Sequence, residues 1–490
     1  MAWRDRLDHL FIDGGWVQPA TDERIEVVSP TTEGVIATVP AASKSDIDRA
    51  VAAARHAFDY GPWPRMTLNE RIAVLKTVSD ALRDNHDAIA DLITDEMGCP
   101  ITQSRTIQVT AGRAILDAAL ELVSDYPFRS VRRSATGHAL VIREPIGVAA
   151  AVVPWNMPLA TTMQKLAPAL LAGCTLVLKS APESPLDAYM LAEMFQDAGL
   201  PAGVLNVVPA DREVSEYLVT HALVDKVAFT GSTAAGRRIA SLCGQDLRRV
   251  TLELGGKSAA VILDDADLDA TVERLRLLSL RNSGQICNLK TRLLVSNRRE
   301  RELVDRLVAL LGSMPVGDPH DPATQIGPMV AARQRARVEN YIQLGQEQGA
   351  KLVIGGGRPP DLDRGWFVEP TLFTAVEPDM SIAQEEIFGP VLSVLTYEDE
   401  DQAIAIANNS SYGLSGAVFT SDVEHGLQLA RRMRTGTVEL NGNIVGFYAP
   451  VGGFKCSGIG RESGPEGIDE YVELKSVGLP RDIEVTGVSG

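Results

Sequence analysis

The sequence has few cysteines and no paired cysteine motif. Its 490 residues contain five cysteines, an odd number, and they are widely scattered. This pattern argues against a disulfide framework and against a structural zinc site, so we expect no metal site. Reduced thiols in a reducing compartment fit best. The five are Cys99, Cys174, Cys243, Cys287 and Cys456.

The sequence also lacks a hydrophobic run long enough to span a bilayer. Its most apolar stretches, 146–153 and 166–178, are shorter than the roughly 18 to 20 residues that a spanning helix needs. The first ten residues mix charges into what would have to be the apolar core of a secretory signal. We therefore predict a cytoplasmic protein.

The sequence also has no excess of basic over acidic residues. The chain carries 47 basic and 64 acidic residues, for a net charge of −17. This balance disfavours the counterion release on which nucleic-acid binding depends, and it offers no polybasic patch for a membrane surface. We expect neither nucleic acid nor membrane as a partner, which leaves small molecules and other protein chains.

The chain is long enough for two or more domains, since a single hydrophobic core stops growing well below this length. Strand-like apolar runs alternate with helical patterns between residues 148 and 229, which indicates a parallel sheet with helices on its faces. A second pattern of the same kind covers about 258–455. A capping-box spacing at 67–70 precedes a helical apolar pattern that we expect to form one long helix, ending at Gly98.

Cys287 and Glu253 are the candidate catalytic residues. A thiol can attack a carbonyl carbon, and a carboxylate that activates water can later hydrolyse the thioester. Taken alone, each has an ordinary alternative, because a lone cysteine is more often a small buried hydrophobe and a lone glutamate a solvated charge. The surrounding motifs decide between these interpretations.

Six separated motifs resemble the aldehyde dehydrogenase superfamily, and they occur in the family's order over most of the chain. One short motif can arise by chance, whereas six in register leave little room for coincidence. The motifs are Pro154-Trp-Asn-Met-Pro158, Phe229-Thr-Gly-Ser-Thr-Ala-Ala-Gly236, Leu252-Glu-Leu-Gly-Gly-Lys-Ser258, Ser283-Gly-Gln-Ile-Cys-Asn-Leu-Lys-Thr-Arg292, Glu385-Glu-Ile-Phe-Gly-Pro390 and Gly452-Gly-Phe-Lys-Cys-Ser-Gly-Ile-Gly-Arg-Glu462.

The resemblance implies a mechanism. Cys287 attacks the aldehyde carbon, Glu253 activates the water that hydrolyses the acyl-enzyme, and Asn156 stabilises the oxyanion together with the backbone N–H of Cys287. Asn156 could otherwise be only a turn residue. Glu462 is either an auxiliary proton route or the partner in a buried ion pair. Relatives that pass the acyl group to coenzyme A generally lack the base at position 253, so hydrolysis is favoured.

The cofactor site is predicted where residues 231–236 follow an apolar strand and open a helix, a place that attracts a pyrophosphate. The segment lacks the G-x-G-x-x-G fingerprint, so by itself it could equally be a tight turn. In the family, many NAD-specific members carry a glutamate that would repel a 2′-phosphate at the position where this chain has Pro182. We still predict NAD, and the departure at Pro182 leaves NADP open. The resemblance implies cofactor contacts by Val153, Pro154, Trp155, Lys179, Gly231, Ser232, Gly236, Leu254, Glu386 and Phe388.

None of the residues expected to line the substrate site is a cation. A carboxylated or phosphorylated aldehyde would be expected to need an Arg or Lys there, so we predict an uncharged, moderately hydrophobic aldehyde. The alternatives are a semialdehyde dehydrogenase for a charged substrate and a non-catalytic binding or structural relative. The expected lining residues are Met157, Gln164, Ile286, Asn288 and Phe447.

We therefore expect an α/β fold with three parts. A Rossmann-like cofactor domain with a parallel sheet would comprise residues 1–124 and 144–255, and a second α/β domain, carrying the catalytic cysteine, would comprise 256–456. Residues 125–143 and 457–490 would form a small β arm and the C-terminal tail. In the family such an arm pairs with a neighbouring subunit, which implies a homodimer or homotetramer.

Overall fold

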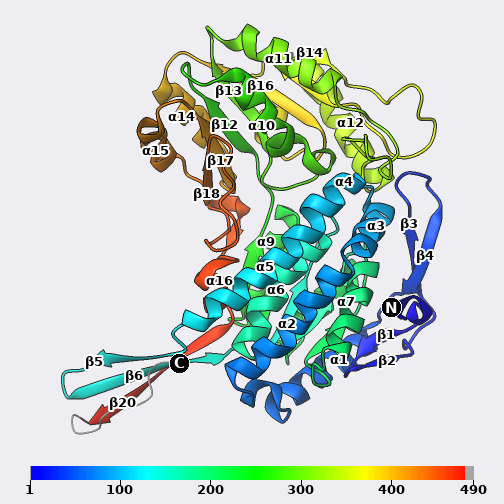
Figure 1. Ribbon diagram of the computed structural model, residues 1–490, viewed down its shortest axis with the longest axis vertical. Helices are drawn as coiled ribbons and strands as arrows, with labels where there is room; N and C mark the ends of the chain where they lie inside the picture. Colours follow the sequence, from blue (N-terminus) through cyan, green and yellow to red (C-terminus); the bar gives the residue numbers. More distant parts are fainter. Residues whose placement is uncertain (1, 481–490) are drawn as a thin grey trace.

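The computed structural model describes residues 2–480, which form two α/β lobes and a projecting β arm (Figure 1). Each lobe is built on its own large sheet, and the arm is a separate three-stranded sheet that extends from the lobe containing the N-terminus. The predicted α/β architecture is therefore present, with both large sheets and the small antiparallel one. The exact domain boundaries remain a prediction.

The first sheet has eight strands in the order β19-β11-β10-β7-β8-β9-β1-β2. The five strands from β11 to β9 are parallel, and antiparallel strands lie at both edges. The bounds are β1 Leu10–Ile12, β2 Gly15–Val17, β7 Val148–Val152, β8 Thr175–Lys179, β9 Leu205–Val207, β10 Lys226–Thr230, β11 Arg249–Glu253 and β19 Gly458–Ile459.

Helices cover both faces of this sheet, which is why its central strands are continuously apolar. Along β7, Ala149 and Ala151 belong to the core on one face, while Val148, Ala150 and Val152 belong to the core on the other. The helices on the two faces are α1 Lys44–Asp59, α2 Leu68–Asp84, α3 His86–Met97, α5 Thr110–Leu122, α6 Pro158–Ala172, α7 Leu186–Asp197, α8 Arg212–Thr220 and α9 Thr233–Gln245.

The predicted long helix after residue 67 is two helices, α2 and α3, so that prediction was wrong about its length. The capping box is present: the Thr67 side chain accepts from the Glu70 N–H, and the Glu70 carboxylate accepts from the Thr67 N–H at 2.7 Å. At Asn85 the backbone leaves helical geometry, and its side-chain amide donates to the Ala81 carbonyl oxygen at 2.8 Å. Asparagine competes in this way with the helical ladder and ends α2.

The second sheet has seven strands in the order β14-β15-β16-β13-β12-β17-β18, all parallel except β14. Its strands are β12 Ser258–Ile262, β13 Lys290–Ser296, β14 Lys351–Ile354, β15 Thr371–Thr374, β16 Val391–Tyr397, β17 Ser415–Phe419 and β18 Thr437–Leu440. Its main helices are α10 Leu268–Leu280, α11 Glu300–Gly312, α12 Ala332–Glu347, α14 Glu400–Asn408 and α15 Val423–Arg432.

The arm consists of β5 Arg129–Arg133, β6 Gly137–Pro145 and β20 Val472–Pro480, with β6 in the middle of an antiparallel sheet. Strand β20 reaches it through α16 Gly464–Asp469, which packs against α5 and α6. A further hairpin joins β3 Arg24–Val28 and β4 Val35–Pro40. Within residues 2–480, no helix combines the length and apolarity that crossing a membrane requires, and no group of acidic, histidine and cysteine side chains is arranged to hold a metal ion.

Candidate active site

Several predicted site residues lie at the carboxyl ends of neighbouring strands of the first sheet. Glu253 is the last residue of β11, Lys179 is the last residue of β8, and Gly231 follows β10. The loop that contains Asn156 follows β7, which lies between β8 and β10. Because the carboxyl ends of parallel strands meet at one edge, the fold brings these residues together where ligands of such sheets bind.

The turn that carries Cys287 is held rigidly by buried hydrogen bonds. Asn282 and Ser283, in the 3₁₀ turn Arg281–Gly284, both have left-handed backbone conformations, with φ of 50° and 55°. The Ser283 hydroxyl accepts from the Gly327 N–H at 2.9 Å, and Gln285 Oε1 accepts from the Val330 N–H at 3.0 Å. Strained backbone of this kind persists only where its surroundings enforce it, and it is concentrated at functional sites.

Asn156 contacts this turn directly. It is buried, and its side-chain nitrogen donates to the Gln285 carbonyl oxygen at 2.8 Å, two residues before Cys287. Its own carbonyl oxygen accepts from the side-chain amides of Gln108 and Asn282, each at 3.0 Å. Since an amide nitrogen carries two hydrogens, Asn156 keeps a second N–H donor for another acceptor.

Glu253 is a buried carboxyl with an unsatisfied oxygen. Its side chain is 7% exposed, and Oε1 has no hydrogen-bond partner among the described residues. Burial, together with the negative charge of Glu462, raises its pKa well above the usual range, while Lys165 and Arg461 act in the opposite direction. The protonated form of Glu253 is therefore favoured compared with that of an exposed glutamate.

Lys165 is the buried cation that neutralises Glu462. Its Nζ lies 2.7 Å from Glu462 Oε1 and also donates to Thr230 Oγ1 at 2.5 Å. Lys165 is fully buried and Glu462 nearly so. Glu462 is thus the partner in a buried ion pair, and its charge acts on Glu253, while its role as an auxiliary proton route stays a prediction.

Cys287 lines a recess together with Ile286, Lys257, Glu386 and Phe388. Burial raises the pKa of its thiol to about 12, the carboxylates of Glu386 and Glu253 add to this, and Arg281 opposes it. The thiol is therefore protonated at neutral pH in this structure. To act as a nucleophile it must give its proton to a base.

Glu386 and Phe388 reach this recess from a turn that packs against α12. Glu386 Oε1 accepts from the Gly256 N–H at 3.0 Å, and burial raises the pKa of the carboxyl to about 7. Phe388 has φ of 65°, and its ring meets the Trp155 ring edge-on at 5.6 Å between centroids. From α12, the Gln334 amide donates to the Phe388 carbonyl oxygen at 2.7 Å and Arg337 donates to the Glu386 carbonyl oxygen.

The residues at the start of α9 fit a dinucleotide. Ser232 caps this helix by accepting from the Ala235 N–H at 3.3 Å. A Cβ at Gly231 would lie 2.5 Å from the Phe229 ring, and one at Gly236 would lie 2.4 Å from the Leu254 side chain, so both glycines are required by close packing. Free N–H groups at a helix start attract phosphate.

At the end of β8, which is separated from β10 by β7, Lys179 is buried, and burial lowers the pKa of its amine to about 8. The adjacent Ser180 hydroxyl is buried without a hydrogen-bond partner among residues 2–480. Both groups can bond to a polar ligand, such as a ribose. Val153 and Pro154 belong to the adjacent loop, where the Val153 N–H donates to the Lys179 carbonyl oxygen at 3.1 Å.

The predicted substrate-lining residues fall into two places. Ile286 lines the Cys287 recess, whereas Gln164 and Phe447 line a second recess whose other walls are mostly apolar. Met157 packs beside the core of the first lobe, as Phe447 does. Asn288 Oδ1 accepts from the Arg281 guanidinium at 2.8 Å. The remaining residues of the second recess are Ile115, Ala119, Leu122, Pro168, Ser463, Gly464, Gly467 and Ile468.

Sequence reasoning missed Arg281 and Lys165. Arg281 places a positive charge beside Cys287, and its Nε is buried without an acceptor in the described part of the chain. It lies six residues before Cys287 and two before the motif that begins at Ser283, and this closeness in sequence was the available signal. Lys165 directly follows the predicted Gln164, but its partner Glu462 is 297 positions away and no spacing rule connects them.

A sequence model of the aldehyde dehydrogenase family matches residues 16–477 of the chain. Geranial dehydrogenase from Castellaniella defragrans is 46% identical over 472 residues, which are 96% of this chain and 98% of that protein. A 3-succinoylsemialdehyde-pyridine dehydrogenase from a Pseudomonas species is 43% identical over 471 residues, with the same coverage of 96% and 98%.

Solved structures agree over nearly the whole fold. An aldehyde dehydrogenase of Mycobacterium tuberculosis complexed with NAD+ has a TM-score of 0.96 and 45% identity, covering 98% of this chain and 99% of that one. A mutant of aldehyde dehydrogenase C from Pseudomonas syringae, complexed with NAD+ and octanal, has a TM-score of 0.94 and 39% identity, covering 96% and 97%. The similarity thus includes both lobes and the arm.

Proposed function

The chain belongs to the aldehyde dehydrogenase family, and we propose that it oxidises an uncharged, moderately hydrophobic aldehyde to its carboxylic acid with NAD as the electron acceptor. One observation carries the proposal. Asn156 bonds to the turn that bears Cys287, and the Cys287 thiol is close enough to the buried Glu253 carboxyl for that charge to raise its pKa. These contacts support a site in which nucleophile, oxyanion donor and base act together.

In this proposal Cys287 loses its proton to a base and its sulfur attacks the aldehyde carbon. The second N–H of Asn156 and the backbone N–H of Cys287 bond to the oxyanion that develops. NAD, when bound, accepts the hydride from the former aldehyde carbon. Donors placed in advance of the charge that they stabilise are usually the largest single contribution to such a reaction.

Hydrolysis of the thioester requires a base for water, and Glu253 is the candidate. Its unsatisfied Oε1 can accept the proton of the attacking water, and its raised pKa makes it a stronger base than an ordinary glutamate. Glu462 and Lys165 act on Glu253 rather than on the substrate. Through their charges they set the pKa of Glu253 and offer a route for the proton away from the site.

We assign the cofactor contacts to the residues at the strand ends and on the Glu386 turn. The start of α9, with Gly231, Ser232 and Gly236, would hold the pyrophosphate, Lys179 would hold the adenosine ribose, and Glu386 and Phe388 the nicotinamide end. Trp155, Pro154, Val153 and Leu254 would complete the walls. NAD is preferred because two similar structures contain it, while Pro182 leaves NADP to be tested.

The substrate preference rests on the second recess, which is largely apolar, and on the relatives that act on geranial or bind octanal. Arg281 favours a second candidate, an aldehyde with a carboxylate. We rank this candidate lower because Arg281 already bonds to Asn288 and is near the negative charge of Glu439. A cytoplasmic location and a homo-oligomer formed through the arm are further parts of this proposal.

The first experiment is to follow reduced cofactor with octanal or succinate semialdehyde, using NAD or NADP, with Cys287→Ala protein in parallel. We expect Cys287-dependent reduction of NAD and a higher kcat/KM for octanal. A kcat/KM for succinate semialdehyde far above that for octanal would refute the uncharged substrate. Glu253→Gln should keep a burst of reduced cofactor but lose most steady-state turnover, and full steady-state activity would exclude Glu253 as the base.

A further inference from the structure

Lys257 is a buried amine in the active site to which the proposed reaction gives no role. It follows Gly255 and Gly256 on the connection between β11 and β12, and its side chain is 2% exposed. It lines the same recess as Cys287, Glu386 and Phe388. A molecule in this recess would therefore be next to both Cys287 and Lys257.

Unlike Lys165, Lys226 and Lys290, the buried Lys257 has no carboxylate bonded to it among the described residues. Lys165 pairs with Glu462 at 2.7 Å, Lys290 with Glu439 at 2.8 Å and Lys226 with Glu470 at 3.2 Å. The carbonyl oxygen of Lys257 accepts from Arg292 Nε at 2.9 Å, but its Nζ has no hydrogen-bond acceptor among residues 2–480. Buried charges are normally paired, so an unpaired buried amine is expected to be neutral.

The surrounding charges agree with a neutral amine. Burial lowers the pKa of Lys257 to about 7, and the positive charges of Arg292 and Arg337 act in the same direction. Glu386 and Glu385 oppose this shift without cancelling it. At pH 7 about half of such amines are unprotonated, whereas an ordinary lysine with a pKa of about 10.4 is unprotonated in fewer than about one molecule in a thousand.

We propose that Lys257 is a second carbonyl-reactive group of the active site, which forms a reversible imine with an aldehyde when no cofactor covers it. The amine nitrogen attacks the aldehyde carbon to give a carbinolamine. The nitrogen then loses its remaining proton, the hydroxyl leaves as water, and a C=N bond replaces the C=O bond. No oxidant or reductant is needed, and added water reverses the step.

Glu386 is placed to move the protons in this reaction. It lines the same recess, and burial raises the pKa of its carboxyl to about 7, so at neutral pH both its acid and its base forms are present. The acid form can protonate the departing hydroxyl, and the base form can accept the proton from nitrogen. Proton transfer by a group whose pKa is near the working pH is efficient.

The requirement that no cofactor cover Lys257 rests on the proposed function, because that proposal assigns Glu386 and Phe388 to the nicotinamide end of NAD. A bound cofactor would occupy the recess and separate Lys257 from the aldehyde. Aldehyde that arrives before the cofactor would instead be held on Lys257. The reaction would then be inhibited by excess aldehyde and protected by excess NAD.

Reductive trapping tests the proposal. Cys287→Ala protein, which has no catalytic thiol to compete, is incubated at pH 7 with propanal and cyanoborohydride, digested, and searched by mass spectrometry for propylated lysines. Lys76, which is exposed, and Lys290, which is buried but paired with Glu439, are measured in the same digest as controls. We expect labelling of Lys257 to be at least about tenfold that of Lys76, with Lys290 unlabelled, because Lys257, unlike these two controls, combines a neutral amine with access.

A second sample contains saturating NAD, whose binding is measured independently by calorimetry. Labelling of Lys257 should then fall while labelling of Lys76 is unchanged. Labelling of Lys257 no faster than Lys76 would overturn the proposal, as would labelling that NAD leaves unchanged in protein that binds it. Fast labelling of Lys257 in protein that does not bind NAD would support the reactive amine and reject the cofactor assignment instead.

Discussion

The pKa values of the residues in this site depend on burial and on the charges of neighbouring buried residues. Burial shifts Glu253, Glu386 and Cys287 toward their neutral forms. The charge of Glu462 also raises the pKa of Glu253, and the charges of Glu253 and Glu386 raise that of Cys287. Lys165 and Arg281 oppose these shifts from two sides. A single change of charge should therefore change the pH dependence of the reaction.

Glu462→Gln should shift the acidic limb of the kcat profile to lower pH. Glu253 must be unprotonated to activate water, so kcat rises as pH passes upward through its raised pKa. Removing the Glu462 charge removes a cause of that rise and leaves Lys165 unpaired, and both effects lower the pKa of Glu253. The measurement is steady-state kcat against pH, under conditions in which hydrolysis limits turnover.

Glu470→Gln is the matched control for this change. Glu470 also pairs with a buried lysine, Lys226, but it does so at the opposite, amino end of β10. Its loss should leave the acidic limb where it is. An acidic limb that stays in place, or moves to higher pH, in Glu462→Gln would show that Glu462 does not act on Glu253.

At the scale of elements, α12 positions the turn that carries Glu386 and Phe388. Gln334→Ala should weaken NAD binding by up to about tenfold, because one hydrogen bond to a strained turn contributes about 0.5–1.5 kcal/mol. Calorimetric titration with NAD measures the change in Kd. Gln343→Ala, on the same helix, removes only an exposed bond to Glu347 and should leave the Kd unaltered. Equal effects of the two substitutions would contradict a positioning role.

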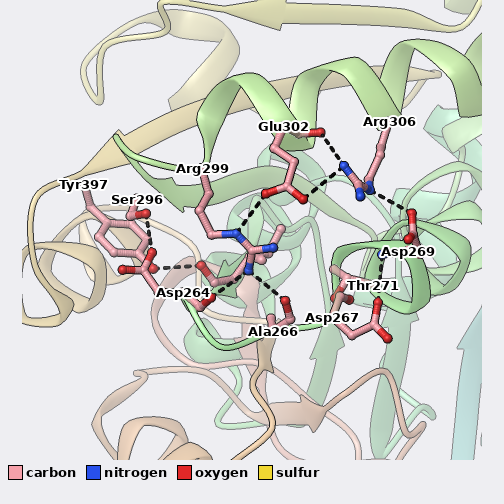
Figure 2. Close-up of polar contacts among 11 residues, drawn as sticks. Asp264, Ala266, Asp267, Asp269, Thr271, Ser296, Arg299, Glu302, Arg306 and Tyr397 are labelled. Carbon is pink, nitrogen blue, oxygen red and sulfur yellow. Dashed lines mark hydrogen bonds and ion pairs between the residues drawn. The ribbon is translucent and has the colours of Figure 1, made fainter.

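A second element-scale feature is the network that joins β12, α10 and α11 (Figure 2). Arg299 donates to the carbonyl oxygens of Asp264 and Ala266, each at 2.7 Å, and bonds to Glu302. Arg306 links the same Glu302 to Asp269. The Arg299 side chain thereby holds the connection between the buried strand β12 and helix α10 in place.

Arg299→Ala should lower the free energy of unfolding by about 1–3 kcal/mol, since two carbonyl groups lose a charged donor. Activity per folded molecule should not change, because none of these residues lines the Cys287 recess. Arg301→Ala is the control: its side chain is 96% exposed, and its ion pair with Asp305, the only one it makes within residues 2–480, is at 3.9 Å. This control should lower the free energy of unfolding by less than about 0.5 kcal/mol. Denaturant titration measures the free energy of unfolding of both variants. Similar losses for the two variants would refute the role of Arg299.

Local sequence patterns predicted most of the strands and helices, but they did not predict contacts between residues that are distant in sequence. The alternation of strands and helices and the strand-end placement of Asn156, Lys179 and Glu253 follow from local pattern and sheet geometry. The contact of Gln334 with Phe388 and the ion pair of Lys165 with Glu462 depend on how whole elements pack. Nothing in the residues beside each partner predicts such contacts.

At the scale of the whole molecule, the arm has no helix packed over it as the two large sheets have (Figure 1). Most of β20 is exposed, including Leu474 at 63% and Val477 at 38%. Its outer edge also offers backbone groups that can pair with another strand. An exposed apolar edge of this kind is expected to be covered in solution, and a second copy of the chain is the occupant that we propose.

The double variant Leu474→Asp/Val477→Asp should therefore shift the protein toward a monomer, because two charges would have to be buried without partners at the subunit contact. Size-exclusion chromatography with light scattering gives the mass directly. Tyr60→Asp is the control: Tyr60 directly follows α1, outside the arm, and is 76% exposed, so a charge there should leave the mass unchanged. Because the arm contributes no residue to the Cys287 recess, burst reduction of NAD should persist in a dissociated arm variant. An arm variant that keeps the mass of the unaltered protein would show that the arm does not hold subunits together.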